Sequence, residues 1–155
     1  MKLSELLTPD RIRIPLTAAD KSGALRELVS LIPARSAGGD QAGILQSVLE
    51  REERMSTGIG QGVAIPHGKT ELVEQMEMAF GIAAKPMDYE ALDGEPVDLF
   101  FLLVSPPELT GQHIKVLAQI SRMLSSDGFR DGLGRVKDAQ GVLDLLRREE
   151  PETTP

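Results

Sequence analysis

Leu99-Phe100-Phe101-Leu102-Leu103-Val104 is the longest apolar run in this chain of 155 residues. The run falls far short of the roughly 20 residues that a membrane-spanning helix requires, so it predicts a buried strand over 97–104. Another long strand is predicted over 76–84, and the loop between the two strands carries proline, glycine and aspartate. Because helical patterns precede and follow this pair of strands, the sequence indicates an α/β sheet covered on both faces.

Shorter elements are predicted around this pair from apolar spacing, helix caps and breakers. A helix that begins after Asp20 is predicted to end before Pro33, and the next helix is predicted after Asp40, a good N-cap. Thr110 is predicted to cap the helix that follows the long strands. The remaining predictions are a helix over 3–7, a strand over 12–16, a turn-rich loop at Gly58, Gly60 and Gly62, a strand over 63–65 ended by Pro66, and a last helix over 136–148.

Composition and charge narrow the classes of function. The chain has 24 acidic and 17 basic residues, a net charge of −7, which disfavours a groove for nucleic acid and an anionic lipid surface alike. The absence of cysteine excludes disulfides and thiol catalysis. Glu5 interrupts the apolar stretch that a signal peptide needs, so we expect a cytoplasmic protein without direct membrane insertion. One domain is expected over 1–150, with a frayed tail over 151–155.

Motifs of nucleotide and metal sites are matched only superficially. The segment from Gly62 to Thr70 ends in Gly-Lys-Thr, but five residues rather than four separate Gly62 from Gly68, and Pro66 lacks an amide hydrogen for a phosphate. Gly58-Ile59-Gly60 precedes a predicted strand, which reverses the order of a dinucleotide fingerprint. The two histidines are fewer than the three ligands of a typical catalytic zinc site and lack a short ligand spacing. We therefore expect no cofactor and no metal.

The two histidines are the main candidates for nucleophilic or acid–base chemistry. His67 follows Pro66 at the predicted end of a short strand, a place where loops often carry functional side chains. The alternative is a histidine in an ordinary surface turn. Position alone does not decide between them.

Arg51 and His113 are polar residues on predicted helix faces that are otherwise apolar. Arg51 has two interpretations: its stem lies along the core edge, or its guanidinium binds an anion. His113 is either a core histidine with a backbone partner or a donor to an anion at the first turn of its helix. Their expected apolar neighbours are Ile44, Val48 and Met55 for Arg51, and Leu117, Ile120 and Leu124 for His113.

The segment around His67 also resembles a known signature. Glu52, Ile59-Gly60 and Val63-Ala64-Ile65-Pro66-His67-Gly68 are similar, in residues and spacing, to the active-site signature of the phosphotransferase-system enzyme IIA family of the fructose/mannitol type. The resemblance extends over nearly the whole chain, through the opening seven residues and the segments 102–104 and 113–117. The opening is most similar to the nitrogen-regulatory branch of the family.

This resemblance implies a three-layer α/β/α sandwich on a mixed sheet of about five strands. It implies that His67 accepts a phosphoryl group through Nε2 from a histidine phosphocarrier protein, HPr or its nitrogen-type counterpart, while Arg51 and His113 hold that group. Two roles stay open: a regulatory protein that signals through its phosphorylation state, which the length of the chain favours, and a sugar-transport component that passes phosphate to an enzyme IIB. A non-catalytic module on the same fold is a third alternative.

Overall fold

The structure, a computed structural model, describes residues 2–33 and 41–150. The helices are α1 (Leu3–Leu6), α2 (Lys21–Val29), α3 (Gln41–Arg54), α4 (Thr110–Leu124), α5 (Asp127–Arg135) and α6 (Ala139–Glu149), with short 3-10 turns at η1 (Pro9–Arg11) and η2 (Pro107–Leu109). The strands are β1 (Ile12–Leu16), β2 (Gly58–Gly60), β3 (Val63–Ala64), β4 (His67–Lys69), β5 (Glu77–Met87) and β6 (Val97–Ser105).

These strands form one mixed sheet in the order β1-β5-β6-β3-β2, and β4 also pairs with β6. Strands β5 and β6 are antiparallel, whereas β1 runs parallel to β5, and both β3 and β4 run parallel to β6. The predicted sheet of about five strands is therefore six-stranded in the described part of the chain. The additional strand forms because the chain resumes pairing with β6 immediately after Pro66, which puts His67 inside β4 rather than in a loop after a strand.

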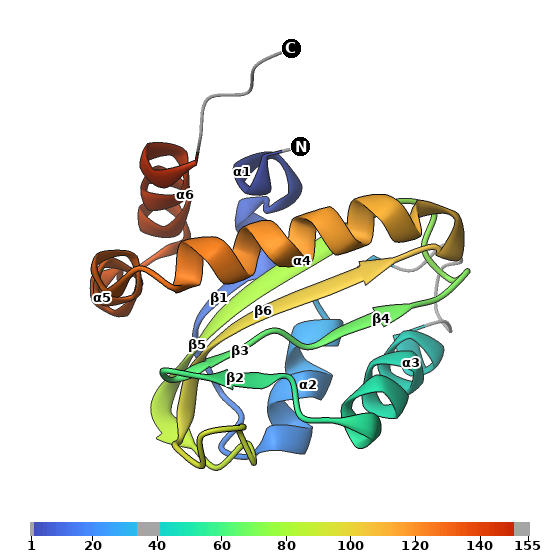
Figure 1. The fold of residues 1–155 in the computed structure, drawn as a ribbon, viewed down its shortest axis with the longest axis horizontal. Helices are drawn as coiled ribbons and strands as arrows, with labels where there is room; N and C mark the ends of the chain where they lie inside the picture. Colours follow the sequence, from blue (N-terminus) through green and yellow to red (C-terminus); the bar gives the residue numbers. More distant parts are fainter. Residues whose placement is uncertain (1, 34–40, 151–155) are drawn as a thin grey trace.

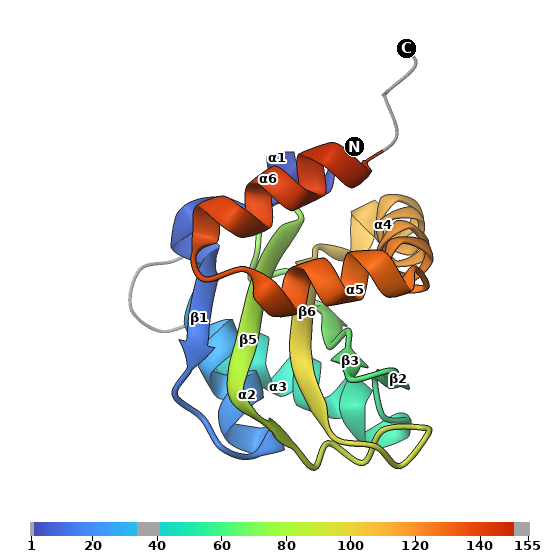
Figure 2. The same cartoon turned by 90° about the vertical axis from the view of Figure 1, so that its left-hand side faces the viewer.

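The apolar run of β6 is buried on both faces, which explains why it lacks the alternation of a half-exposed strand. Leu99, Phe101 and Leu103 pack in a core with α1, α4, α5 and α6. Their neighbours Phe100 and Leu102 pack in a second core, with α2 and α3. Figures 1 and 2 show these two groups of helices on opposite sides of the sheet. The predicted three-layer α/β/α architecture is confirmed.

The N-terminal half of the structure agrees closely with the sequence-based predictions. Strand β1 has the predicted bounds, α1 is one residue shorter than predicted, and Asp20 caps α2 by accepting a hydrogen bond from the Gly23 amide at 2.7 Å. Asp40 and the tail 151–155 lie outside the described residues. The turn-rich glycine segment is in part a strand, because Gly58–Gly60 pairs with β3, and only Gln61 and Gly62 form the turn, both with positive φ.

Two predictions about where helices begin are wrong. Thr110 is not the cap of α4: the N-cap position is Leu109, and the Thr110 hydroxyl donates to the Pro107 carbonyl at 2.6 Å, since η2 leads directly into the helix. The last helix begins at Ala139 rather than Val136, because the Asp138 side chain accepts from the Gly141 amide and caps it there.

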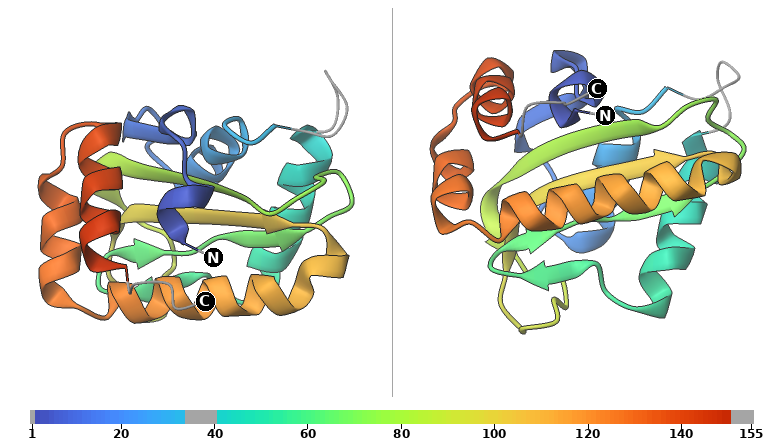
Figure 3. Two further views of the ribbon diagram at one scale, coloured as in Figure 1. Left: turned by 90° about the horizontal axis from the view of Figure 1, so that it is seen from above. Right: turned by 45° about the horizontal axis from the view of Figure 1, so that its top comes forward.

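Helix α5 has no counterpart in the sequence predictions. It contains three glycines, which are weak helix formers, and its stability comes from tertiary packing instead. Ser126 caps its start, and Phe129 and Leu133 are buried in the α4-side core. Figure 3 shows α5 and α6 packed together at one end of the sheet, with α4 lying along β6. Within the described ranges, no helix combines the length and apolar composition needed to cross a membrane.

Candidate functional site

A cleft of about 500 Å³ lies where α3, β4 and α4 meet, and it brings Arg51, His67 and His113 together. Each of these three residues comes from a different element, and Figure 1 shows β4 between the two helices. The lining residues are Ser47, Glu50, Arg51 and Arg54 from α3, His67, Gly68 and Lys69 from β4, and His113, Ile114 and Leu117 from α4.

Gly68 brings α3 close to His67. A Cβ on Gly68 would lie 2.8 Å from the Ser47 hydroxyl oxygen and 3.2 Å from the Val48 amide nitrogen, so only glycine lets the α3 backbone pack this closely on β4. Neighbouring residues of a strand point to opposite faces, so His67 projects to the α4 side. Arg51 lies one helical turn beyond Ser47 and lines the cleft beside His67.

The His67 ring has one nitrogen engaged and one free for chemistry. Its Nδ1 donates to the Ile65 carbonyl oxygen at 2.9 Å; a carbonyl only accepts, so this nitrogen carries the ring proton. Nε2 therefore keeps its lone pair. Burial lowers the pKa of His67 below its usual value, and the positive charge of Arg51 acts in the same direction. The ring is thus neutral at pH 7, with an unprotonated Nε2.

His113 lies directly beside His67, with the two ring centroids 5.5 Å apart. It is 1% exposed and belongs to the first turns of α4. Its Nδ1 shares a hydrogen bond of 2.5 Å with the Ser105 hydroxyl. Burial lowers the pKa of His113 to about 4, with smaller contributions from His67 and Lys69, so this ring is also neutral at pH 7.

The helix faces expected for Arg51 and His113 differ in detail from the observed ones. Met55 lies beyond the end of α3 and is 59% exposed, so it is not part of a buried stripe; the buried residues of α3 are Ile44, Val48 and Glu52. Arg51 is half-buried at the cleft, and its Nη1 donates to the Met55 carbonyl at 2.9 Å. Leu117 is half-buried and lines the cleft, whereas the buried residues that follow His113 in α4 are Val116, Ile120 and Leu124.

Positively charged side chains are concentrated at the cleft, although the chain is acidic overall. Arg51, Arg54 and Lys69 line it together with one carboxylate, Glu50. The first turn of α4, which carries His113, also faces this cleft, and the N-terminal end of a helix dipole adds positive potential. This electrostatic arrangement favours an anion beside the His67 ring.

Two residues at or near the site were not singled out from the sequence. Ser105 contacts His113, and the only signal for it is its position: it continues the α4-side row Leu99, Phe101, Leu103 with a polar side chain. In the sequence, Glu52 is marked only by its place in the family signature. It is buried, accepts from the Thr57 amide at 2.8 Å, contacts the Tyr89 hydroxyl at 3.1 Å, and pairs with Lys21 at 3.0 Å. This network fixes the end of α3 just after Arg51.

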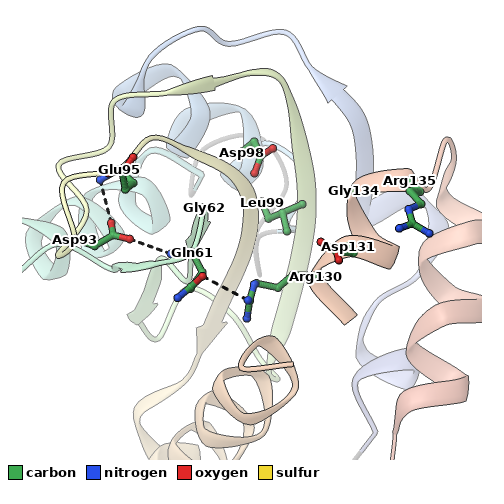
Figure 4. A pocket seen from close by; sticks show the side chains of 10 residues that line it. All are labelled: Gln61, Gly62, Asp93, Glu95, Asp98, Leu99, Arg130, Asp131, Gly134 and Arg135. Atoms are coloured by element: carbon green, nitrogen blue, oxygen red, sulfur yellow. Dashed lines mark hydrogen bonds between the residues drawn. The ribbon is translucent and has the colours of Figure 1, made fainter. Parts of the chain in front are cut away.

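A second cleft, of about 760 Å³, lies at the β2–β3 turn and α5, away from both histidines. Its polar groups largely engage one another: Asp93 accepts from the Gln61 amide, and Arg130 donates to the Gln61 side chain (Figure 4). Asp98 also lines it, and burial raises the pKa of that carboxyl. Among the described residues, no three His, Asp or Glu side chains are grouped to hold a metal ion.

The fold and the first cleft define a class: an α/β/α protein with a neutral histidine on a strand, in a cleft lined by positively charged side chains between two helices. Comparison with known families places the chain within that class. The family model described as "Phosphoenolpyruvate-dependent sugar phosphotransferase system, EIIA 2" matches residues 5–149. The chain belongs to this family.

Relatives of both expected branches are similar in sequence. The chain is 36% identical over 146 residues to a nitrogen regulatory protein of Bradyrhizobium diazoefficiens, covering 94% of this chain and 95% of that one. It is 31% identical over 150 residues to the fructose-specific EIIABC component of Bacillus subtilis, covering 97% of this chain but 24% of that longer protein. A similar solved structure is the nitrogen regulatory protein IIA-Ntr of Neisseria meningitidis, with a TM-score of 0.87 and 33% identity over 93% of this chain and 98% of that one.

Proposed function

We propose that His67 is the phosphoryl acceptor of this protein and that phosphorylation of His67 serves nitrogen-type regulation. The donor is the phosphohistidine of a carrier protein, HPr or its nitrogen-type counterpart. The Nε2 lone pair of His67 attacks phosphorus, the carrier's N–P bond breaks, and that electron pair returns to the carrier's imidazole. The observation that carries the proposal is the neutral His67 ring, with Nδ1 donating to Ile65 and Nε2 free, in a cleft rich in cations.

Arg51 and His113 act in this proposal as donors to the phosphoryl oxygens. A transferring phosphoryl group spreads negative charge over three equatorial oxygens, and positioned donors stabilise that charge. A guanidinium supplies a fixed positive charge and a planar set of donors, while a neutral imidazole supplies one ring hydrogen. Because donor and acceptor are both imidazoles, the transfer is close to balanced in free energy and reversible.

Regulation is favoured over transport by the relatives, which include a nitrogen regulatory protein at 36% identity and the IIA-Ntr structure at a TM-score of 0.87. A phosphohistidine changes the charge of the cleft by about −1.5 to −2, enough to select between binding partners. The second candidate is the sugar-transport role, in which His67 passes its phosphoryl group to an enzyme IIB. The similarity to a fructose-specific component supports it.

The test is incubation with a carrier protein that holds labelled phosphohistidine. We expect a modification that is stable in base, labile in acid and absent from His67→Ala, with an unchanged melting temperature as the control for folding. Label retained by His67→Ala would refute the assignment. Adding a fructose-type enzyme IIB then separates the two roles: rapid movement of label to that partner supports transport, and retention on His67 supports regulation.

A further inference from the structure

Ser105 places a buried hydroxyl at the end of an otherwise apolar row of side chains. It is the last residue of β6, is fully buried, and follows Leu99, Phe101 and Leu103 on the α4 side of the sheet. Its Cα pairs in register with Lys69, two residues after His67 in the neighbouring strand. A polar group here costs free energy unless it is hydrogen-bonded, and its side-chain partner among the described residues is the His113 ring.

His113 has one ring proton to place on two nitrogens. Because its pKa is about 4, the ring is neutral near pH 7 and exists as one of two tautomers. Nδ1 lies 2.5 Å from the Ser105 hydroxyl oxygen, whereas the buried Nε2 has no hydrogen-bond partner in the described part of the chain. The tautomer therefore decides whether Nε2 is a donor or an acceptor.

The surroundings of Ser105 favour one direction for this hydrogen bond. If His113 Nδ1 carried the proton and donated, the buried hydroxyl hydrogen of Ser105 would have no acceptor among the described residues. If Ser105 donates instead, its single hydrogen is satisfied by the bare Nδ1. Donation from Ser105 leaves the ring proton of His113 on Nε2.

We propose that Ser105 is a positioning residue that donates to His113 Nδ1 and so fixes the Nε2–H tautomer, which supplies the donor for a phosphoryl oxygen on His67. The two neighbouring rings then hold opposite tautomers. The Ile65 carbonyl keeps the proton of His67 on Nδ1 and leaves a lone pair for attack, and the Ser105 hydroxyl keeps the proton of His113 on Nε2 and leaves a donor. The role of Ser105 in phosphoryl transfer rests on the proposed function. The tautomer of His113 does not depend on it.

The tautomers are measured directly by nitrogen NMR of the histidine rings in the unphosphorylated protein at pH 7.5. The chain has two histidines, so His67→Gln assigns both rings. We expect His113 protonated on Nε2 and His67 on Nδ1. We further expect Ser105→Ala to move a measurable share of His113 to the Nδ1–H form and Ser105→Thr, which keeps the hydroxyl, to restore the wild-type ratio. Wild-type His113 protonated on Nδ1, or a ratio unchanged in Ser105→Ala, would overturn the inference.

A double-mutant cycle separates positioning from packing. Ser105→Ala should slow phosphoryl transfer to His67 or shorten the phosphohistidine lifetime by about 2- to 12-fold, the range for one hydrogen bond. In the His113→Gln background, whose amide has no tautomer, Ser105→Ala should cause no further loss. Equal losses in both backgrounds would assign Ser105 a packing role only. Ser126→Ala, which removes the cap of α5, is the control and should leave transfer unchanged.

The two proposals fail in different ways. If wild-type protein takes no label on His67, the proposed function is wrong, while the NMR spectrum of the unphosphorylated protein still decides the tautomer of His113. If label is taken up but His113 is protonated on Nδ1, the proposed function stands and the role of Ser105 is wrong.

Discussion

The rings of His67 and His113 meet edge to face, with centroids 5.5 Å apart and an interplanar angle of 62°. One ring belongs to β4 at the sheet and the other to α4, which covers that face of the sheet. Each ring has Nδ1 hydrogen-bonded to a neighbouring group, Ile65 in one case and Ser105 in the other. The contact therefore combines two neutral imidazoles with fixed orientations at one cleft.

Arg51→Gln should slow phosphorylation of His67 by roughly 100-fold, because removal of one donor to a developing negative charge costs about that much. Arg51→Lys keeps the charge without the planar set of donors and should be intermediate. The measurement is the rate of label uptake from a phosphorylated carrier. Arg26→Gln, on the exposed side of α2, is the matched control. An uptake rate that does not change in Arg51→Gln would return Arg51 to a structural role.

His113→Gln should weaken the pH dependence of stability between about pH 7 and pH 5. The pKa of His113 is about 4 in the folded chain and about 6.5 in the unfolded chain, so the unfolded state binds more protons in this interval and stability falls as the pH falls. One such proton adds at most about 1.4 kcal/mol per pH unit to the slope of the unfolding free energy against pH. Urea unfolding at several pH values measures the slope, and equal slopes for wild type and variant would contradict this assignment.

Gly68→Ala should destabilise the protein by about 1–3 kcal/mol, the usual cost of overpacking, and should also reduce phosphorylation of His67. The added Cβ would meet α3 at Ser47 and at the Val48 backbone and push Arg51 away from the site. Gly134→Ala in α5 is the control, because nothing lies within 4 Å of its added Cβ. Unfolding free energy and label uptake are measured for both variants. If Gly68→Ala changes neither the unfolding free energy nor the label uptake, the position of α3 does not depend on this close approach.

Glu52→Gln should lower the free energy of unfolding by about 1–3 kcal/mol, the range for removing a charged hydrogen-bond acceptor from a buried site. Burial by itself would raise the pKa of this carboxyl, but the hydrogen bonds from Thr57 and the contact with Lys21 outweigh burial and hold it below its usual value. Glu53→Gln changes the exposed neighbour and should have little effect. Chemical unfolding at pH 7 compares the two, and equal stabilities would rule out a stabilising role for the Glu52 network.

Local patterns predicted most strands of the sheet and each described helix except α5. The apolar run of β6 and the cap at Asp20 depend on neighbouring residues and were readable from the sequence. Helix α5 was not, because its three glycines argue against a helix until Phe129 and Leu133 are buried in the core. Strand β4 was missed as well, since its pairing partner in β6 lies far along the chain.

Residue identity and spacing alone were enough to recognise the family signature, the α/β class and the small number of possible nucleophiles that singled out His67. Which nitrogen of His67 is free, and the contact between Ser105 and His113, depend on the packed fold. Those features depend on atoms from β4, β6, α3 and α4 that meet only when the sheet and both helix layers are packed. Side-chain spacing along one element carries no information about hydrogen bonds between elements, and in this protein such bonds set the chemistry of the two rings.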